Sequence, residues 1–386
     1  MSQPIQPIQP ILQFGTSRFL QAHVDLFVSE ALANGADNAA GAALGGIMVV
    51  QSSDNPANVQ RVAALAADTG YPVRIRGLLR GQQIDTTVTC NAVREAVQAV
   101  THWPRLLEAM AGEVRVIVSN TADRGYQLDA QDHAGLIGHA HDVPRSFPAK
   151  LLVLLEHRWQ RQAAVPLSIF PCELIERNGD TLRDLVCTLA SEWALPAAFI
   201  VWLRTHCVWA NSLVDRIVSE ALYPVGAVAE PYALWAIEQQ EGLVLPCRHA
   251  AIVLTDDLER HERLKLFLLN AGHTYLAERW QQDQRAADET VAQAMQDVVL
   301  RADLEALWNE EILPVFEALG ERDQALAYLV DLRERFLNPY LAHRLADIAQ
   351  NHVQKKQRRL GPVVAMAEKV RPALLQPRLQ AALAQQ

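Results

Sequence analysis

The order of elements near the N-terminus restricts the fold more than any other feature of this sequence. Residues 11–14 form a short apolar run, and a Gly-Thr-Ser turn follows at residues 15–17. Apolar residues then recur at helical spacing, at Leu20, Val24, Phe27 and Ala31. A β-branched run follows at residues 46–50. Strand, tight turn, helix and strand in this order predict the opening of a dinucleotide-binding unit.

The alternation of strands and helices continues to about residue 220. The predicted elements are strands at residues 114–119 and 165–170, a helix at 148–159, and a hairpin of strands at 73–79 and 83–90. Such alternation is typical of an α/β domain with a largely parallel sheet. We therefore predict that residues 1–228 form a Rossmann-like NAD-binding domain.

From residue 230 onward the composition favours helices. Ala, Leu, Glu, Gln and Arg are frequent, and β-branched runs are scarce apart from residues 250–254. Helices are predicted at residues 258–279, 289–309, 324–336 and 339–356. The predicted fold class is α/β, with the Rossmann-type domain followed by a mostly helical C-terminal domain. We expect this second domain, residues 229–386, to carry the substrate and catalytic residues.

Bulk composition argues against several functional classes. The formal net charge of -9 disfavours nucleic-acid binding. The five scattered cysteines, without a C-x-x-C pair, favour reduced thiols in the cytoplasm. Neither a signal peptide nor an apolar run of about 18 residues is found, so no membrane span is expected. The one dense basic cluster is expected to be a solvated helix face: Lys355, Lys356, Arg358 and Arg359.

The Gly15 turn is a candidate phosphate site. A glycine directly after a strand lets the backbone approach a ligand, and the N–H groups of the next helix suit a pyrophosphate. Thr16 or Ser17 can cap that helix, and Arg18 adds positive charge. The usual fingerprint has three glycines and this turn has one, so an ordinary strand–helix turn stays open as an alternative. Asp54, after the second strand, is the candidate ribose-binding acid.

A second candidate site lies in the segment KLFLLNAGHT, residues 265–274. On a regular helix, at about 100° per residue, Lys265, Asn270 and His273 share one side. In a dry pocket the pKa of a lysine falls from about 10.4 toward neutrality, so the amine can take the proton of an alcohol. Asn270 can donate to the same oxygen and His273 can orient the substrate, while a nicotinamide accepts the hydride. The alternative is a structural helix with a snorkelling lysine and a core histidine.

Six stretches together resemble the mannitol dehydrogenase family, the polyol-specific long-chain dehydrogenases. In chain order they read FGTSRFLQAH, IVSNTADRGY, SFPAKL, NSLVDRIV, LKLFLLNAGH and RFLNPYLAH. Within the family, PCELIERNGDTLRDLV is most similar to the tagaturonate reductase, or altronate oxidoreductase, branch. Ser17 stands at a family glycine, and Leu174 stands where the polyol enzymes have an asparagine that holds the reacting oxygen. The uronate branch also has leucine there, and this chain is shorter at its C-terminus than that branch.

The resemblance implies a role for each candidate residue. Lys265 is the implied general base, with Asn270 and His273 as polarising and orienting partners. The implied cofactor-binding residues are Gly15, Thr16, Ser17, Arg18, Phe19, Ser119, Asn120 and Thr121, and Asp54 joins them from its place after the second strand. The implied substrate-binding residues are Lys150, Asn211, Asn338 and His343. Structural alternatives stay open: Lys150 as a cap of the interdomain cleft, Asn338 as a helix N-cap before Pro339, and His343 as a packed core residue.

The expected function is that of a cytoplasmic, metal-independent, NAD-dependent dehydrogenase. Its partner would be a small sugar acid of the altronate–tagaturonate type, rather than nucleic acid or a membrane, and the sequence does not separate NAD from NADP. A polyol or polyol-phosphate dehydrogenase and a catalytically inactive sugar-acid sensor are the alternatives. The His-rich residues 139–142 read as a polar loop rather than a metal site. No pattern indicates an oligomeric state.

Overall fold

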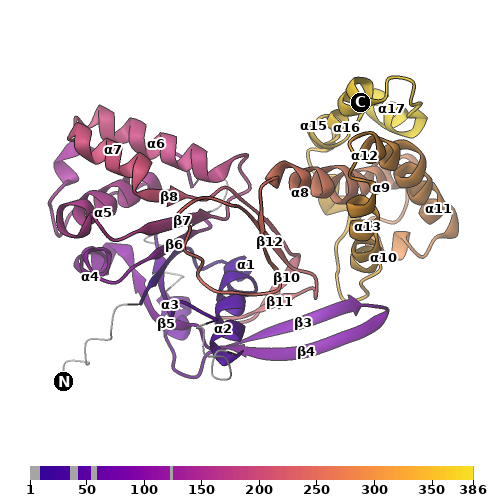
Figure 1. Cartoon of the computed structure of the whole chain (residues 1–386). Coiled ribbons are helices and arrows are strands. Elements are labelled where there is room, and N and C mark those ends of the chain that lie inside the picture. Colours follow the sequence, from indigo (N-terminus) through magenta and orange to yellow (C-terminus); the bar gives the residue numbers. More distant parts are fainter. Residues whose placement is uncertain (1–8, 35–41, 54–58, 122–124, 386) are drawn as a thin grey trace. The chain divides into compact units, whose positions relative to one another are not determined.

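A computed structural model of the chain describes residues 9–34, 42–53, 59–121 and 125–385. They form two compact units, an α/β unit and a helical unit (Figure 1). The α/β unit comprises Met1–Arg74, Thr87–Ala229 and Ala233–Leu258, and the helical unit comprises Ile75–Thr86, Glu230–Tyr232 and Glu259–Gln386. The predicted domain boundary after residue 228 stays a prediction.

The α/β unit is built on a six-stranded parallel sheet with the order β5-β2-β1-β6-β7-β8. Its strands are β1 Ile11–Phe14, β2 Ile47–Gln51, β5 Val93–Gln98, β6 Val116–Ser119, β7 Leu167–Pro171 and β8 Cys207–Trp209. The order reverses between β1 and β6, which is the switch point of a Rossmann sheet. Every residue of β1, β2, β6 and β7 is buried, which explains their continuous apolar runs. The predicted fold class is confirmed.

The helices of this unit pack along the sheet. They are α1 Arg18–Gln21, α2 Val24–Asn34, α3 Val59–Leu65, α4 Ala99–Ala111, α5 Phe147–Gln162, α6 Asn178–Glu192 and α7 Ala197–Thr205. Helix α5 starts where it does because Ser146 accepts a hydrogen bond from the N–H of Ala149, and Pro148 fits the first turn. Figure 1 shows α5 beside α4 and α6, and these helices share an apolar core with the sheet.

The remaining strands of the described residues form two smaller sheets. One has the order β10-β11-β3-β4, and the other has the order β13-β12-β9. The strands are β3 Tyr71–Leu79, β4 Gln82–Cys90, β9 Ser212–Asp215, β10 Val218–Ala221, β11 Ala227–Ala229, β12 Leu234–Glu238 and β13 Ile252–Thr255. The predicted hairpin is confirmed: Arg80 and Gly81, with φ of 53° and 75°, form the two-residue turn between β3 and β4. Strand β5 and the short strands β8 to β12 were not predicted from the sequence.

The helical unit contains two π-helical segments, here called π1 (Lys265–Asn270) and π2 (Leu307–Ile312). Its α-helices are α8 Leu258–Leu264, α9 Ala271–Gln282, α10 Val291–Ala294, α11 Val298–Ala306, α12 Leu313–Ala318, α13 Arg322–Phe336, α14 Leu345–Ile348, α15 His352–Arg359, α16 Gly361–Val370 and α17 Pro377–Ala384. They enclose a second apolar core that includes Leu268, Trp308 and Phe336. The regular helices predicted at 258–279 and 289–309 are therefore interrupted.

The helix predicted at residues 339–356 is wrong over its first part. Asn338 does not cap a helix: its Oδ1 accepts a hydrogen bond from the N–H of Tyr340 at 3.0 Å, and its Nδ2 donates to the carbonyl of Arg76 at 3.2 Å. The backbone then pairs with another segment, because the carbonyl of His343 accepts from the N–H of Val291 at 2.9 Å. Backbone groups used in this way are not available to a helical ladder.

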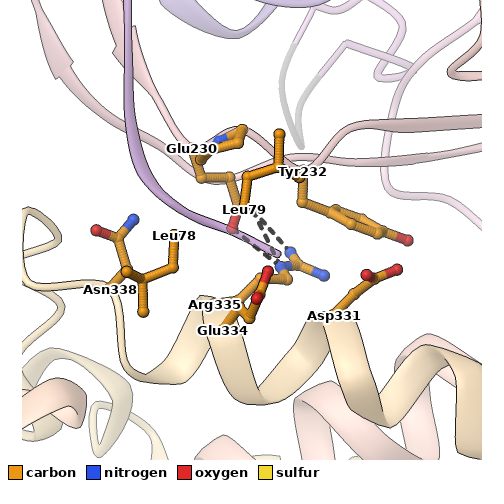
Figure 2. Close-up of a pocket in the computed structure, with 9 residues that line it drawn as sticks. Leu78, Leu79, Glu230, Tyr232, Asp331, Glu334, Arg335 and Asn338 are labelled. Atoms are coloured by element: carbon orange, nitrogen blue, oxygen red, sulfur yellow. Dashed lines mark hydrogen bonds and ion pairs between the residues drawn. The ribbon is translucent and has the colours of Figure 1, made fainter. Parts of the chain in front are cut away.

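A buried ion pair links Glu230 to α13. Arg335 Nε lies 3.0 Å from Glu230 Oε2, and Arg335 Nη2 lies 2.9 Å from Oε1. The two side chains are 3% and 1% exposed, and the guanidinium lies 4.3 Å from the centre of the Tyr232 ring. Figure 2 shows these residues with Asn338 around a pocket of the helical unit.

We predict that Glu230→Gln lowers the free energy of unfolding of the helical unit by about 3 kcal/mol, because it removes the negative charge of a buried pair. Glu317→Gln is the matched control. Its pair with Arg371 is 2.7 Å long, with side chains 55% and 45% exposed, so its loss should cost less than about 1 kcal/mol. Urea denaturation and thermal melting measure both variants. Equal effects would contradict the prediction.

Candidate active site

The turn after β1 lies at the switch point of the sheet. Gly15 has a φ of 125°, which residues with a side chain rarely adopt. Its N–H donates to the carbonyl of Val50 at 3.1 Å, and a Cβ here would lie 2.6 Å from the carbonyl oxygen of Asn120. The turn therefore requires glycine, because it runs against the end of β6.

Two hydroxyl groups hold this turn. Ser17 caps α1 by accepting a hydrogen bond from the N–H of Leu20 at 3.3 Å, and it donates to Asn120 Oδ1 at 3.3 Å. The hydroxyl of Thr16 donates to Gln51 Oε1 at 2.8 Å. The first N–H groups of any helix lack partners within the helix. Donors thus stand at the edge where a Rossmann sheet binds phosphates, with the exposed Arg18 among them.

The helix that follows is broken, which the sequence analysis did not predict. The carbonyl of Ala22 accepts a hydrogen bond from Arg216 Nη1 at 2.7 Å instead of continuing the ladder. His23 is fully buried beside this break, stacks on Phe19 with ring centres 4.8 Å apart, and pairs with the carbonyl of Leu234 at 3.0 Å. Burial lowers the pKa of His23 to about 3, so its ring is neutral and structural.

Two of the three predicted residues at the end of β6, Ser119 and Thr121, bind one buried carboxylate, that of Glu173. Ser119 Oγ donates to it at 3.0 Å, and Thr121 donates to it through its N–H at 2.9 Å and its hydroxyl at 2.8 Å. Asn120 Nδ2 donates to the carbonyl of Cys172 at 2.8 Å. Sequence reasoning missed Glu173, although an acid just after a predicted strand was a usable signal. The structure thus brings the ends of β1, β6 and β7 together.

Two predicted substrate residues of the α/β unit are buried in its interior. Lys150 is 2% exposed, and its Nζ donates to the carbonyl of Arg145 at 2.5 Å. Asn211 is fully buried; its Oδ1 accepts from the N–H of Asp180 at 3.0 Å, and its Nδ2 donates to the carboxylates of Asp180 and Glu238 at 3.0 and 2.6 Å. These contacts hold α6 beside β12. Their substrate roles stay predictions.

Two further positions singled out from the sequence are Asp54 and Leu174. Asp54 lies outside the described residues. Leu174 follows Glu173 directly and is 74% exposed. The loop at residues 139–142 is open to solvent, where His139 Nδ1 lies 3.4 Å from Asp142 Oδ2. Among the described residues, no three His, Cys, Asp or Glu side chains gather in a way that could hold a metal ion.

In the helical unit, π1 carries two of the candidate catalytic residues. Lys265 and Asn270 stand at its two ends and are both half-buried. The carbonyl of Leu268, between them, accepts a hydrogen bond from Trp308 Nε1 at 3.2 Å. The Trp308 ring can approach because Gly272 has no side chain: a Cβ there would lie 3.0 Å from the ring. The regular spacing assumed for these residues is therefore wrong, since π turns carry an additional residue and are frequent at functional sites.

His273 lies one turn beyond π1 and is 6% exposed. Its ring stacks on Phe336 with centres 4.3 Å apart, and meets the ring of His343 edge-on at 4.8 Å. Burial first, and then the nearby His343, Arg335 and Arg359, hold the pKa of His273 well below its ordinary range. The ring is therefore neutral, and it can donate or accept a proton in a hydrogen bond.

The prediction that the basic cluster of α15 forms a solvated face is wrong for part of the cluster. Lys356 is 2% exposed and lies 2.9 Å from Glu278 Oε2. Lys355 and Arg359 are half-buried, whereas Arg358 is exposed. Helical spacing explains the split, because residues 355, 356 and 359 share one side of the helix.

A parallel sheet in Rossmann order with a glycine turn at its switch point is the fold of nucleotide-dependent dehydrogenases. Residues 9–244 match the mannitol dehydrogenase Rossmann domain, and residues 257–384 match the mannitol dehydrogenase C-terminal domain. The chain belongs to the mannitol dehydrogenase family and is an oxidoreductase that acts on CH–OH groups. The resemblance drawn from its six motifs is thereby confirmed.

Known proteins resemble the chain over most of its length. An altronate oxidoreductase of Halalkalibacterium halodurans is 31% identical, covering 91% of this chain and 69% of that protein. One of Klebsiella pneumoniae is 33% identical, covering 97% and 78%. Two solved structures share the fold at 19% identity: a substrate-free D-sorbitol dehydrogenase (TM-score 0.75, 93% and 76% covered) and the Pseudomonas fluorescens mannitol 2-dehydrogenase with NAD and D-mannitol (TM-score 0.71, 97% and 78% covered). None of the helices among the described residues is long and apolar enough to span a membrane.

We predict that Gly15→Ala weakens NADH binding at least tenfold, because the new methyl group would push the turn away from the end of β6. Gly138→Ala is the matched control: Gly138 also has a positive φ, of 80°, but a Cβ there would meet nothing within 4 Å. Quenching or enhancement of NADH fluorescence measures both affinities. Equal affinities for the two variants would contradict this role of the turn.

Proposed function

We propose that the chain is an NAD-dependent dehydrogenase that interconverts a hydroxyl and a ketone on a sugar acid of the altronate–tagaturonate type. The observation that carries this proposal is the identity of 31% and 33% with altronate oxidoreductases over nearly the whole chain. Leu174 supports it, because the resemblance to the uronate branch implies leucine at this position, whereas a polyol enzyme of the family would be expected to have asparagine.

We assign the cofactor to the carboxyl edge of the Rossmann sheet. The Gly15 turn fits a dinucleotide for two reasons. Gly15 has no side chain to keep the ligand away from the backbone, and the capped first turn of α1 follows directly. Ser119, Asn120 and Thr121 hold the neighbouring strand end through Glu173 and Cys172. When bound, the nicotinamide accepts the hydride; the protein residues position it and hold the reacting proton.

We assign the proton chemistry to the helical unit. Lys265 takes the proton of the substrate hydroxyl as general base, and Asn270 donates a hydrogen bond to the same oxygen. His273 is neutral, so it orients a second hydroxyl without adding charge. Their arrangement supports these roles, because π1 places Lys265 and Asn270 at its two half-buried ends while residues 267–269 are buried in the core.

We predict that Lys265→Ala lowers kcat on the best sugar acid by about a thousandfold, the usual contribution of a general base. Its NADH affinity should be unchanged, and small primary amines should restore part of the turnover. Lys369→Ala, at an exposed lysine of α16, is the control and should turn over normally. Initial rates with NAD and NADP across aldonates, hexuronates, alditols and phosphorylated alditols provide the measurement.

The outcomes of this panel are distinct. Normal turnover by the Lys265→Ala variant would contradict the assignment of the base. Wild-type turnover on alditols alone would contradict the sugar-acid assignment. NADH binding without turnover on any member would favour the sugar-acid sensor.

A further inference from the structure

Arg359, at the end of α15, is a half-buried cation that faces no carboxylate partner among the residues that the structure describes. Its Nη1 donates a long hydrogen bond, 3.4 Å, to the hydroxyl of Thr274, the residue after His273. Within the described part of the chain it forms no ion pair, and burial lowers the pKa of its guanidinium from the ordinary value. Burying a guanidinium without a counter-charge costs free energy.

Other arginines of the helical unit show what is ordinary in this fold. Six half-buried or buried arginines each face a carboxylate: Arg263 with Glu321, Arg279 with Asp303, Arg285 with Glu289, Arg333 with Glu305, Arg335 with Glu230 and Arg378 with Asp303. Arg359 departs from this pattern and lies beside the candidate catalytic histidine.

The surroundings of Arg359 are those of an anion site. Burial and, to a lesser extent, the positive charge of Arg359 lower the pKa of both His273 and His343. The two imidazole rings lie 4.8 Å apart. Among the described residues, His343 Nδ1 is enclosed and has no hydrogen-bond partner. Lys355 lies one turn earlier on α15, with its Nζ 2.7 Å from the carbonyl of Ile348. Asp347 is the acidic group that faces His343.

We propose that Arg359 binds the carboxylate of the sugar-acid substrate and so selects acids over alditols. The inference rests on the proposed function and deepens it. A guanidinium presents two parallel N–H donors that match a carboxylate, and such charged hydrogen bonds are the strong ones. The substrate carboxylate supplies the counter-charge that Arg359 lacks among the described residues, while an alditol supplies none. Arg359 is thus a specificity residue, distinct from the proton-transferring Lys265.

The test compares an aldonate with the alditol of the same configuration in wild type, Arg359→Gln, Arg359→Lys and Arg358→Gln. We expect Arg359→Gln to raise KM for the aldonate roughly 10- to 100-fold, the loss of one charged hydrogen-bond pair. Its kcat on the aldonate and its kcat/KM on the alditol should stay near wild type. Arg359→Lys should fall in between. Arg358→Gln removes the same charge from the exposed side of α15 and should behave as wild type.

Activity on the alditol serves as the internal control for folding. If turnover of the alditol is too slow to measure, its inhibition constant against the aldonate is measured instead. An unchanged preference for the acid in Arg359→Gln would overturn the inference, as would an equal loss on both substrates or an equal loss in Arg358→Gln. Wild-type preference for the alditol would also overturn it and leave a dehydrogenase of another substrate class. Failure of the proposed function looks different: the wild type would turn over neither substrate.

Discussion

The contact between Trp308 and π1 is the interaction on which the candidate catalytic geometry depends. The indole N–H holds the carbonyl of Leu268, in the middle of π1, from 40 positions further along the chain. The ring of Trp308 also packs on Phe336, with centres 5.6 Å apart, and Phe336 stacks in turn on His273. One buried side chain therefore sets both the π turn between Lys265 and Asn270 and the orientation of the imidazole. Since Trp308 stands in π2, the two irregular helices fix each other.

This dependence explains which parts could be predicted from sequence. The strand Ile11–Phe14 and its turn were predictable because local apolar pattern and a glycine specify them without help from distant residues. The π turn was not predictable, because its apolar residues repeat as they would in an α-helix. The hydrogen bond from the distant Trp308 to one carbonyl of this turn also has no signature in the local sequence. Strand β5, with half its residues polar, and the three-residue strand β8 are specified mainly by their neighbours in the sheet.

The ion-pair partners of the cations on α15 could not be predicted from the sequence either. The run KKQRR reads as a solvated face, yet Lys356 is buried against Glu278, a partner on α9 that also binds His352 at 2.8 Å. Arg359, on the same side of α15, lies near the hydroxyl of Thr274 and the imidazoles of His273 and His343, and forms no ion pair within the described chain. Sequence alone gives the spacing of the cations. It does not give which of them meets a counter-charge, since the acids come from other helices.

The position of Ser17 bears on whether this chain binds a nucleotide at all. A serine in place of a family glycine motivates the view that the fold has lost catalysis and kept a sensing role. The backbone of Ser17, however, has φ of -68° and ψ of 148°, an extended conformation open to any residue. The position therefore does not require glycine, unlike Gly15 with its φ of 125°. The serine instead caps α1 and binds Asn120, so it holds together the two strand ends that a dinucleotide must contact. The serine is thus compatible with the geometry of the turn, and it gives no support to a loss of cofactor binding.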